Sequence, residues 1–161
     1  MALAKQVFGF FTPPVALMGL GAVDQVGTEA KKLGGKKALL VTDKGLSKAG
    51  VADQVMKLLE EGGVQAVLFD GAEPNPTDKN VADGLKAYQE NNCDMLVSLG
   101  GGSSHDTTKG IGIVATSGGN IRDYAGIDTL KANYPPYIAI NTTAGTGSEM
   151  TCLAVITNTD I

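Results

Sequence analysis

Three consecutive glycines open the segment GGGSSHDTTK, residues 100–109. The apolar run before it, MLVSL, predicts a buried strand, and the residues after it predict a helix. Glycine backbone can approach an anion without interference from a Cβ atom, and the free N–H groups at a helix start suit a pyrophosphate. Ser103 could donate its hydroxyl to such a ligand or cap the helix. The segment predicts phosphate binding, with a tight strand-to-helix turn that binds nothing as the alternative.

A second glycine pattern follows directly, because residues 110–115 (GIGIVA) match the dinucleotide motif G-x-G-x-x-A. That motif requires a strand, a glycine turn and then a helix start. Here the match lies inside the predicted helix instead. We therefore interpret Gly110 and Gly112 as positions of close helix packing and not as ligand contacts.

Asp43 follows the apolar run KALLVT, which predicts a buried strand. A carboxylate there can accept hydrogen bonds from the ribose hydroxyls of an adenosine and repel a 2′-phosphate, which favours NAD over NADP. Two like charges about 4 Å apart repel by about 4 kcal/mol at a surface-like dielectric. The alternative role of Asp43 is to cap the turn through Lys44 and Gly45. Asn75 lies between two prolines in a rigid turn, and it either faces the cofactor or serves the turn alone.

A hydroxyl-rich segment, NTTAGTGSE, follows the apolar run YIAI. Its hydroxyls, those of Thr142, Thr143, Thr146 and Ser148, can both donate and accept hydrogen bonds. Small residues separate them, as is typical of a loop that lines a ligand. A solvated turn is an equally weighted alternative.

The single histidine, His105, stands next to Asp106. Two adjacent residues do not make a metal site, because zinc-type sites need three or four protein ligands. Asp106 in a first helical turn is favoured by the helix dipole, and Lys109 three residues later can pair with it. Cys93 and Cys152 are far apart, have no histidine neighbour, and indicate neither a metal site nor a thiol nucleophile.

These motifs are separated by short apolar runs that alternate with amphipathic helical patterns. Repeated strand–helix–strand alternation predicts right-handed βαβ units and a Rossmann-like parallel sheet with helices on both faces, in a single α/β domain. In such sheets ligands bind beyond the carboxyl ends of the strands, where all four motifs would meet. The predicted strands are residues 15–17, 37–42, 64–69, 95–99, 137–140 and 153–157, and the predicted helices include residues 22–33 and 104–116.

The composition limits the possible functions. The chain has 161 residues, of which 43% are apolar and 19% charged, as in a folded globular domain. The net charge is −4 and no basic run exceeds two lysines, so nucleic-acid binding is not expected. No apolar stretch approaches the roughly 18 residues of a membrane span, and the first residues lack a signal-peptide core. With only two scattered cysteines, we expect a cytoplasmic protein.

Four motifs in this order resemble the N-terminal domain of the iron-dependent (group III) alcohol dehydrogenases. They are VTDKGL around Asp43, PNPT around Asn75, GGGSSHDTTKGIG, and INTTAGTGSE followed by AVITN. The resemblance covers essentially the whole chain, and it is nearest to members of the NAD-dependent methanol dehydrogenase type.

The resemblance implies that the site residues of this chain bind cofactor, and that none of them is catalytic or a metal ligand. The implied residues are Gly101, Gly102 and Ser103 at the pyrophosphate, Asp43 and Asn75 on the adenosine side, Thr142, Thr143 and Thr146 along the cleft with Leu153 nearby, and Asp106 with Lys109 towards the nicotinamide.

The activity implied is the oxidation of a small primary alcohol or diol to the aldehyde, and the reverse, with NAD and a divalent metal (iron, or zinc or magnesium). In that family a C-terminal helical domain supplies the metal ligands, and no segment of this sequence corresponds to it. Residues 1–161 are thus expected to form the dinucleotide-binding domain, inactive alone but part of a homo-oligomer in the family. The alternatives are a stand-alone nucleotide-binding module, or a relative of glycerol dehydrogenase, maleylacetate reductase or dehydroquinate synthase.

Overall fold

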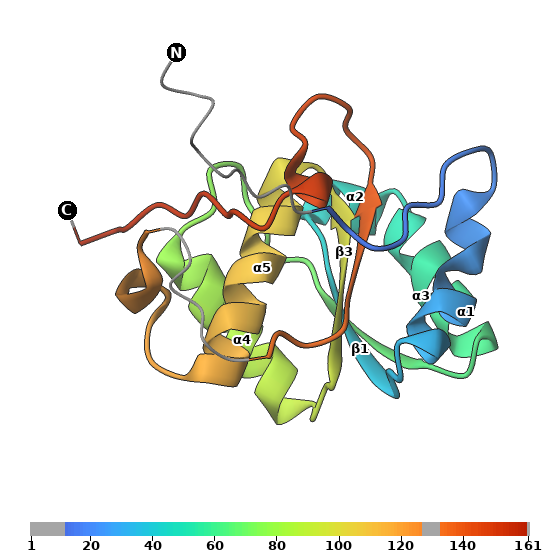
Figure 1. The fold of residues 1–161 in the computed structure, drawn as a ribbon, viewed down its shortest axis with the longest axis horizontal. Helices are drawn as coiled ribbons and strands as arrows, with labels where there is room; N and C mark the ends of the chain where they lie inside the picture. Colours follow the sequence, from blue (N-terminus) through green and yellow to red (C-terminus); the bar gives the residue numbers. More distant parts are fainter. Residues whose placement is uncertain (1–11, 127–132, 161) are drawn as a thin grey trace, which may run out of the picture.

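The computed structural model describes residues 12–126 and 133–160, and their centre is a parallel β-sheet (Figure 1). The strand order is β2-β1-β3-β4, with every neighbouring pair parallel. The strands are β1 Lys37–Val41, β2 Gln65–Phe69, β3 Met95–Gly100 and β4 Tyr137–Asn141. The prediction of a Rossmann-like α/β fold is confirmed.

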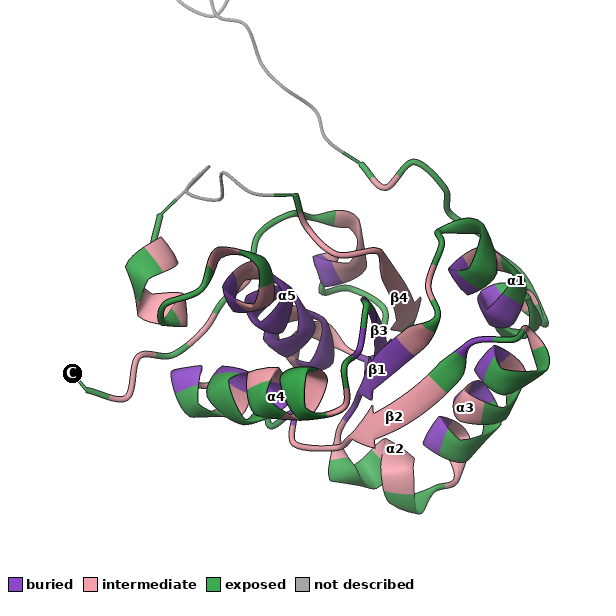
Figure 2. Cartoon of the chain, turned by 90° about the horizontal axis from the view of Figure 1, so that it is seen from below, coloured by how far each residue is buried: buried purple, intermediate pink, exposed green. Residues whose placement is uncertain are grey.

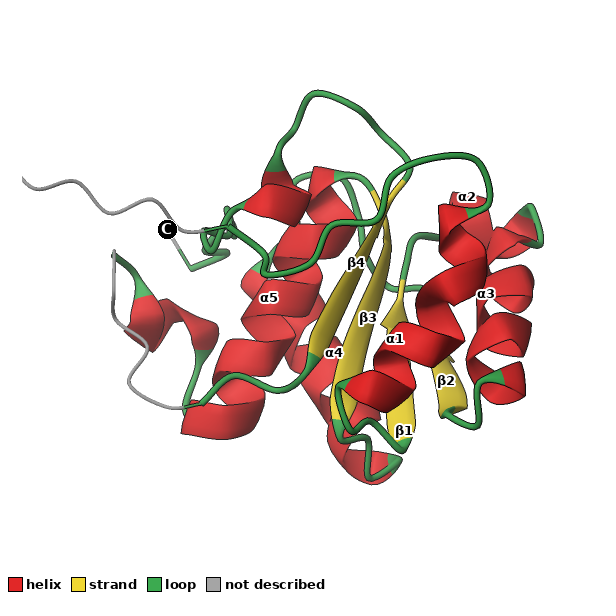
Figure 3. Ribbon diagram, turned by 45° about the vertical axis from the view of Figure 1, so that its right-hand side comes forward, coloured by secondary structure: helices red, strands yellow, loops and turns green. Residues whose placement is uncertain are grey.

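Helices cover both faces of this sheet, as the alternating sequence predicts (Figure 3). Within the described residues α1 and α3 pack on one face, and α4 and α5 pack on the other. The short helix α2 lies at the carboxyl end of β1. The helices are α1 Val26–Lys32, α2 Lys44–Lys48, α3 Val51–Glu61, α4 Asp78–Glu90 and α5 Gly102–Ser117, and the 3₁₀ turns are η2 Ala22–Gln25, η3 Ile121–Tyr124 and η4 Ser148–Met150. No helix among these residues has the length and apolar character needed to cross a membrane.

The central strands are apolar on both faces because both faces are covered (Figure 2). In β1, Ala38 and Leu40 belong to the core under α1 and α3, whereas Leu39 and Val41 belong to the core under α4 and α5. Every residue of β3 is buried. The two cores fix the register of β1, since a slip of one residue would exchange them.

Helix α5 packs closely against its neighbours through glycines in its interior, which confirms the packing role predicted for them. A Cβ atom on Gly110 would lie 2.7 Å from Val81 of α4. One on Gly112 would lie 2.2 Å from the ring of Tyr134, whose hydroxyl donates to the Thr108 and Lys109 carbonyls. These contacts leave no room for a side chain.

Two predicted strands are wrong. Residues 15–17 are irregular, with Val15 60% and Leu17 50% exposed. These three residues follow a proline pair, and the run is too short to pair with the sheet as a strand. Residues 153–157 form one isolated bridge, between Thr157 and Thr77, instead of a strand. Side chains of α5 form hydrogen bonds with backbone groups of that segment, as described below. The helix predicted over residues 22–33 begins as the 3₁₀ turn η2 and becomes α-helical at Val26.

Candidate cofactor site

The predicted site residues lie at the carboxyl edge of the sheet. Asp43 follows β1 and Asn75 follows β2, while the glycine turn follows β3 and the threonine-rich segment follows β4. From β1 the chain moves to β2 on one side, and β3 then pairs with β1 on the other side. The boundary between β1 and β3 is therefore a topological switch point, where open α/β sheets bind ligands.

The glycine turn consists of residues 100–102. Gly100 is required by the fold, whereas Gly101 and Gly102 leave the start of α5 without side chains. Gly100 has a φ of +149°, and a Cβ there would lie 2.3 Å from the hydroxyl oxygen of Ser104. Gly101 is the N-cap of α5 in an extended conformation, and no side chain caps the helix. Ser103 lies inside the first turn, so the capping role considered for it is not used. Its carbonyl accepts a hydrogen bond from the Thr107 hydroxyl at 2.8 Å.

The start of α5 offers unpaired backbone donors. The first intrahelical bond runs from the His105 N–H to the Gly101 carbonyl at 3.1 Å. Within the described residues, the N–H groups of Gly102, Ser103 and Ser104 have no hydrogen-bond acceptor. With the helix dipole behind them, such groups form a favourable site for an anion.

The threonine loop, residues 142–147, lies against this turn. The Thr142 N–H donates to the Gly100 carbonyl at 2.9 Å. A Cβ on Gly101 would lie 3.0 Å from the Thr143 hydroxyl, and one on Gly102 would lie 3.4 Å from Thr146. All three threonines are exposed. The structure therefore brings two of the predicted segments together, with their hydroxyls accessible.

Asp43 performs the capping role that was its alternative assignment. Its Oδ1 accepts hydrogen bonds from the N–H groups of Gly45 at 2.7 Å and Leu46 at 3.1 Å, and so begins α2. Its Oδ2 accepts none from the described residues, so one carboxylate oxygen remains available for a ligand. Asn75 is exposed with a φ of +55°, in the turn between its two prolines.

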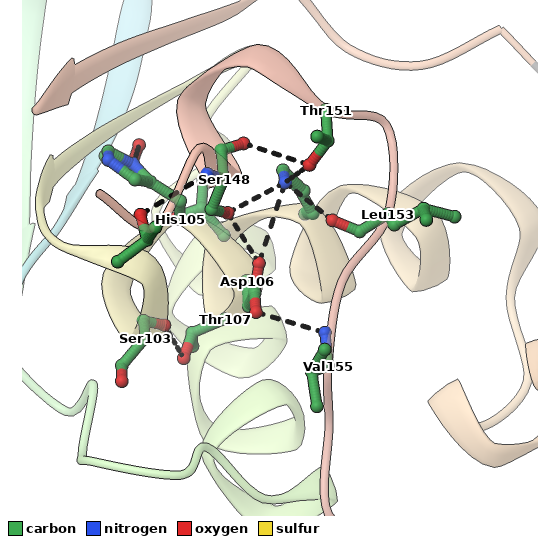
Figure 4. A network of polar contacts seen from close by, with 12 residues as sticks. Ser103, His105, Asp106, Thr107, Ser148, Thr151, Leu153 and Val155 are labelled. Atoms are coloured by element: carbon green, nitrogen blue, oxygen red, sulfur yellow. Dashed lines mark hydrogen bonds and ion pairs between the residues drawn. The ribbon is translucent and has the colours of Figure 1, made fainter. Parts of the chain in front are cut away.

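Asp106 and Lys109 form a buried polar cluster with the segment that follows the threonine loop. Figure 4 shows Asp106 facing Ser148 and Val155 of that segment. The Ser148 hydroxyl donates to Asp106 Oδ1 at 2.6 Å, and the Val155 N–H donates to Asp106 Oδ2 at 3.1 Å. Lys109 Nζ donates to Ser148 at 2.9 Å and to the Leu153 carbonyl at 2.6 Å. The Asp106 and Lys109 side chains are only 13% and 6% exposed.

This cluster gives the two charged residues a wider role than the predicted pairing. Lys109 Nζ is 3.6 Å from Asp106 Oδ1, but its shorter contacts reach residues more than 35 positions away. Burial lowers the pKa of Lys109, while the Asp106 carboxylate opposes that shift. Leu153 takes part through its carbonyl, and its side chain is 52% exposed. The cluster fastens residues 148–155 to the start of α5.

A cavity of about 540 Å³ adjoins this cluster. Lys109 and Leu153 border it, and Ile113, Tyr137 and Ile156 give it apolar walls. Arg122 and Asp78 also border it, so it combines a few charged side chains with a mainly apolar surround, the usual character of a site for a small organic ligand.

His105 is fully buried and is engaged on both ring nitrogens. Nδ1 lies 2.6 Å from the Ser98 hydroxyl, and Nε2 lies 3.2 Å from Asn141 Oδ1. Ser98 in turn lies 2.7 Å from the Tyr137 hydroxyl. The prediction did not include these partners, although Ser98 interrupts an otherwise apolar strand. In residues 12–126 and 133–160 no three His, Cys, Asp or Glu side chains are grouped to hold a metal.

The sequence matches the model of the iron-containing alcohol dehydrogenase family over residues 13–161. It is 51% identical over 159 residues to 1,3-propanediol dehydrogenase from Citrobacter freundii, covering 98% of this chain and 41% of that protein. It is 50% identical to NAD-dependent methanol dehydrogenase from Bacillus methanolicus, covering 92% and 39%. A crystal structure of 1,3-propanediol oxidoreductase superposes with a TM-score of 0.93 at 51% identity, covering 96% and 41%.

The chain thus belongs to the iron-containing alcohol dehydrogenase family, and the resemblance inferred from its motifs is confirmed. It spans about two fifths of the length of these curated relatives.

Proposed function

We propose that this chain is the NAD-binding domain of a metal-dependent alcohol dehydrogenase that interconverts a small primary alcohol or diol with its aldehyde. The unpaired N–H groups of Gly102, Ser103 and Ser104 at the switch point of the sheet carry this proposal. Membership of the family supports it, as do the names of the two relatives, one a diol dehydrogenase and one an NAD-dependent methanol dehydrogenase.

The observed geometry fits a dinucleotide. The diphosphate would accept hydrogen bonds from the amides at the start of α5, where Gly101 and Gly102 present no side chain. Asp43 Oδ2 is free to accept from the adenosine ribose hydroxyls while Oδ1 keeps α2 in place. The exposed hydroxyls of the threonine loop would line the cleft, and Asn75 would border the adenosine.

The nicotinamide end would lie towards the buried cluster. Bound NAD supplies the acceptor for the hydride that leaves the alcohol carbon. Asp106 and Lys109 would hold residues 148–155 in place beside it, with Leu153 at the edge of the cavity. The apolar walls of that cavity would exclude water from the reacting groups.

The metal of the proposed enzyme would be bound elsewhere. The described residues provide no ligand cluster, and the relatives are longer than this chain. We therefore propose that a C-terminal helical domain supplies the ligands for iron, zinc or magnesium. A cytoplasmic location and a homo-oligomeric state stay predictions.

Titration calorimetry with NAD and with ADP-ribose tests this proposal. The chain should bind both, because the amides and Asp43 would contact the ADP-ribose part that the two ligands share. Failure to bind either ligand would refute the proposal.

A stand-alone nucleotide-binding module is the second candidate, since it would bind NAD equally well. The sequence downstream of Ile161 distinguishes the two. An Asp-x-x-x-His pattern with two further histidines supports the dehydrogenase, and an immediate stop codon supports the module.

A further inference from the structure

A chain of hydrogen bonds, with buried Ser98 and His105 at its centre and exposed Asn141 at one end, links the two segments that would enclose the diphosphate. It runs from Tyr137 through Ser98 to His105 and on to Asn141, with successive distances of 2.7, 2.6 and 3.2 Å. His105 lies in the first turn of α5, next to the unpaired amides. Asn141 is the last residue of β4, directly before the threonine loop.

The direction of each bond follows from its neighbours. The Thr143 N–H faces Asn141 Oδ1 at 3.5 Å, which identifies that atom as the acceptor oxygen. His105 Nε2 must then carry a proton to donate to the same oxygen. Burial lowers the pKa of His105 and favours the neutral ring, so Nδ1 is bare and accepts from the Ser98 hydroxyl. Ser98 in turn accepts from Tyr137.

We propose that His105 is a positioning residue which, through Asn141, holds the threonine loop at a fixed distance from the amides at the start of α5. This inference rests on the proposed binding of NAD. The diphosphate cradle would then be formed before the cofactor arrives, and preorganisation of this kind increases affinity because less ordering remains to be done on binding.

The threonine loop depends on few attachments for its position. Residues 142–146 are exposed, and Gly145 and Gly147 have φ values of +109° and +66°. At its start the loop is fixed by the bond from the Thr142 N–H to the Gly100 carbonyl and by Asn141. Asn141 Oδ1 receives both the Thr143 N–H and the His105 ring, so loss of the ring would free the amide side chain that orients the loop.

Two substitutions separate positioning from general stability. In His105→Gln the side-chain amide nitrogen can take the place of Nε2 and donate to Asn141. In His105→Asn the shorter side chain can reach Ser98 but not Asn141. In His105→Gln, Ser98 loses the ring but keeps its bond to Tyr137, and in His105→Asn the residue that loses the ring is the exposed Asn141. Neither variant leaves a buried group without any hydrogen bond, so both should stay folded.

NAD affinity should distinguish these two variants. We expect His105→Asn to bind NAD about tenfold more weakly, and His105→Gln to stay within about twofold of the wild type. Amide hydrogen exchange should be faster at Thr143 in His105→Asn alone. The control Ile111→Val truncates a fully buried side chain further along α5 and should leave NAD affinity unchanged.

The outcomes separate this inference from the proposed function. If the wild type binds no NAD, the proposed function fails first. If it binds NAD and both His105 variants bind equally well, or both weaken in parallel with their stability, His105 is only structural. The chain has one histidine, so a nitrogen-15 spectrum can also be assigned directly. A proton on Nδ1 instead of Nε2 would contradict the bond directions on which the inference depends.

Discussion

Replacing Gly102 with alanine tests whether the fold or a bound ligand requires the start of α5 to lack a side chain. Gly102 is the first residue of the helix and its φ is not positive, so alanine can adopt its conformation. The added methyl would lie 3.4 Å from Thr146, an ordinary van der Waals distance. We expect the free energy of unfolding to stay within about 1 kcal/mol of the wild type.

The same methyl would lie between the amide groups and the threonine loop, where the diphosphate is proposed to sit. A hydrogen bond to a charged group contributes about 1.5–3 kcal/mol, so losing one weakens binding by a factor of about 10 to 150. Gly102→Ala should therefore bind NAD at least about tenfold more weakly while the chain unfolds at nearly the same urea concentration.

Gly100→Ala is the matched control. At a φ of +149°, with a Cβ 2.3 Å from the Ser104 hydroxyl, alanine is strained and also collides. This variant should lose at least about 2 kcal/mol of stability. Calorimetry for NAD and urea denaturation for stability separate the two effects. If Gly102→Ala binds NAD as tightly as the wild type, the backbone amides of this turn do not hold the diphosphate.

Four further predictions follow, three of which concern charged groups and one of which concerns metal. Asp43→Ser keeps a cap for α2 but removes the carboxylate, so the ratio of NADP to NAD affinity should rise; an unchanged ratio would exclude the ribose role. Lys109→Met should cost about 3 kcal/mol in urea denaturation, because it leaves the buried Asp106 carboxylate without its cation; a loss below 1 kcal/mol would be evidence against the buried cluster. Burial, aided by Lys109 and opposed by the Asn141 bond, Glu149 and Asp106, lowers the pKa of His105, so the unfolded chain takes up the proton first. The contribution of His105 to stability should be constant above about pH 6.5 and fall below it by up to about 1.4 kcal/mol per pH unit, a slope that His105→Gln should abolish. Chelation with EDTA should leave the Tm of the chain unchanged, since the described residues hold no ligand cluster.

The fold could be predicted wherever local pattern and burial agree. Apolar runs bounded by glycine, or by a proline pair in the case of β4, predicted β1, β2, β3 and β4 to within one residue at each end. Helix α2 has no apolar stripe and depends on the side chain of Asp43, so periodicity gave no sign of it. The run at 153–157 has β-branched residues, but its backbone groups form hydrogen bonds with the side chains of Asp106 and Lys109 and not with a neighbouring strand. Such tertiary competition is invisible in a local sequence window.

The location of the candidate site at the carboxyl edge of the sheet could be predicted from the sequence. Motifs that follow parallel strands must gather where those strands end, and the structure brings the glycine turn and the threonine loop into contact. The path from Ser98 to His105 and Asn141 was not predicted. His105 and Asn141 are 36 residues apart, and only the pairing of β3 with β4 brings them together.

Gly110 and Gly112 have a practical consequence for anyone who wishes to make this domain more heat-resistant. A common strategy replaces mid-helix glycine with alanine, and it is expected to raise the free energy of unfolding by roughly 0.5–1 kcal/mol per site. In α5 that strategy would force Val81 and Tyr134 apart from the helix, since the new methyl groups would lie 2.7 Å and 2.2 Å from them. Attempts at thermostabilisation should therefore leave Gly110 and Gly112 of this helix unchanged.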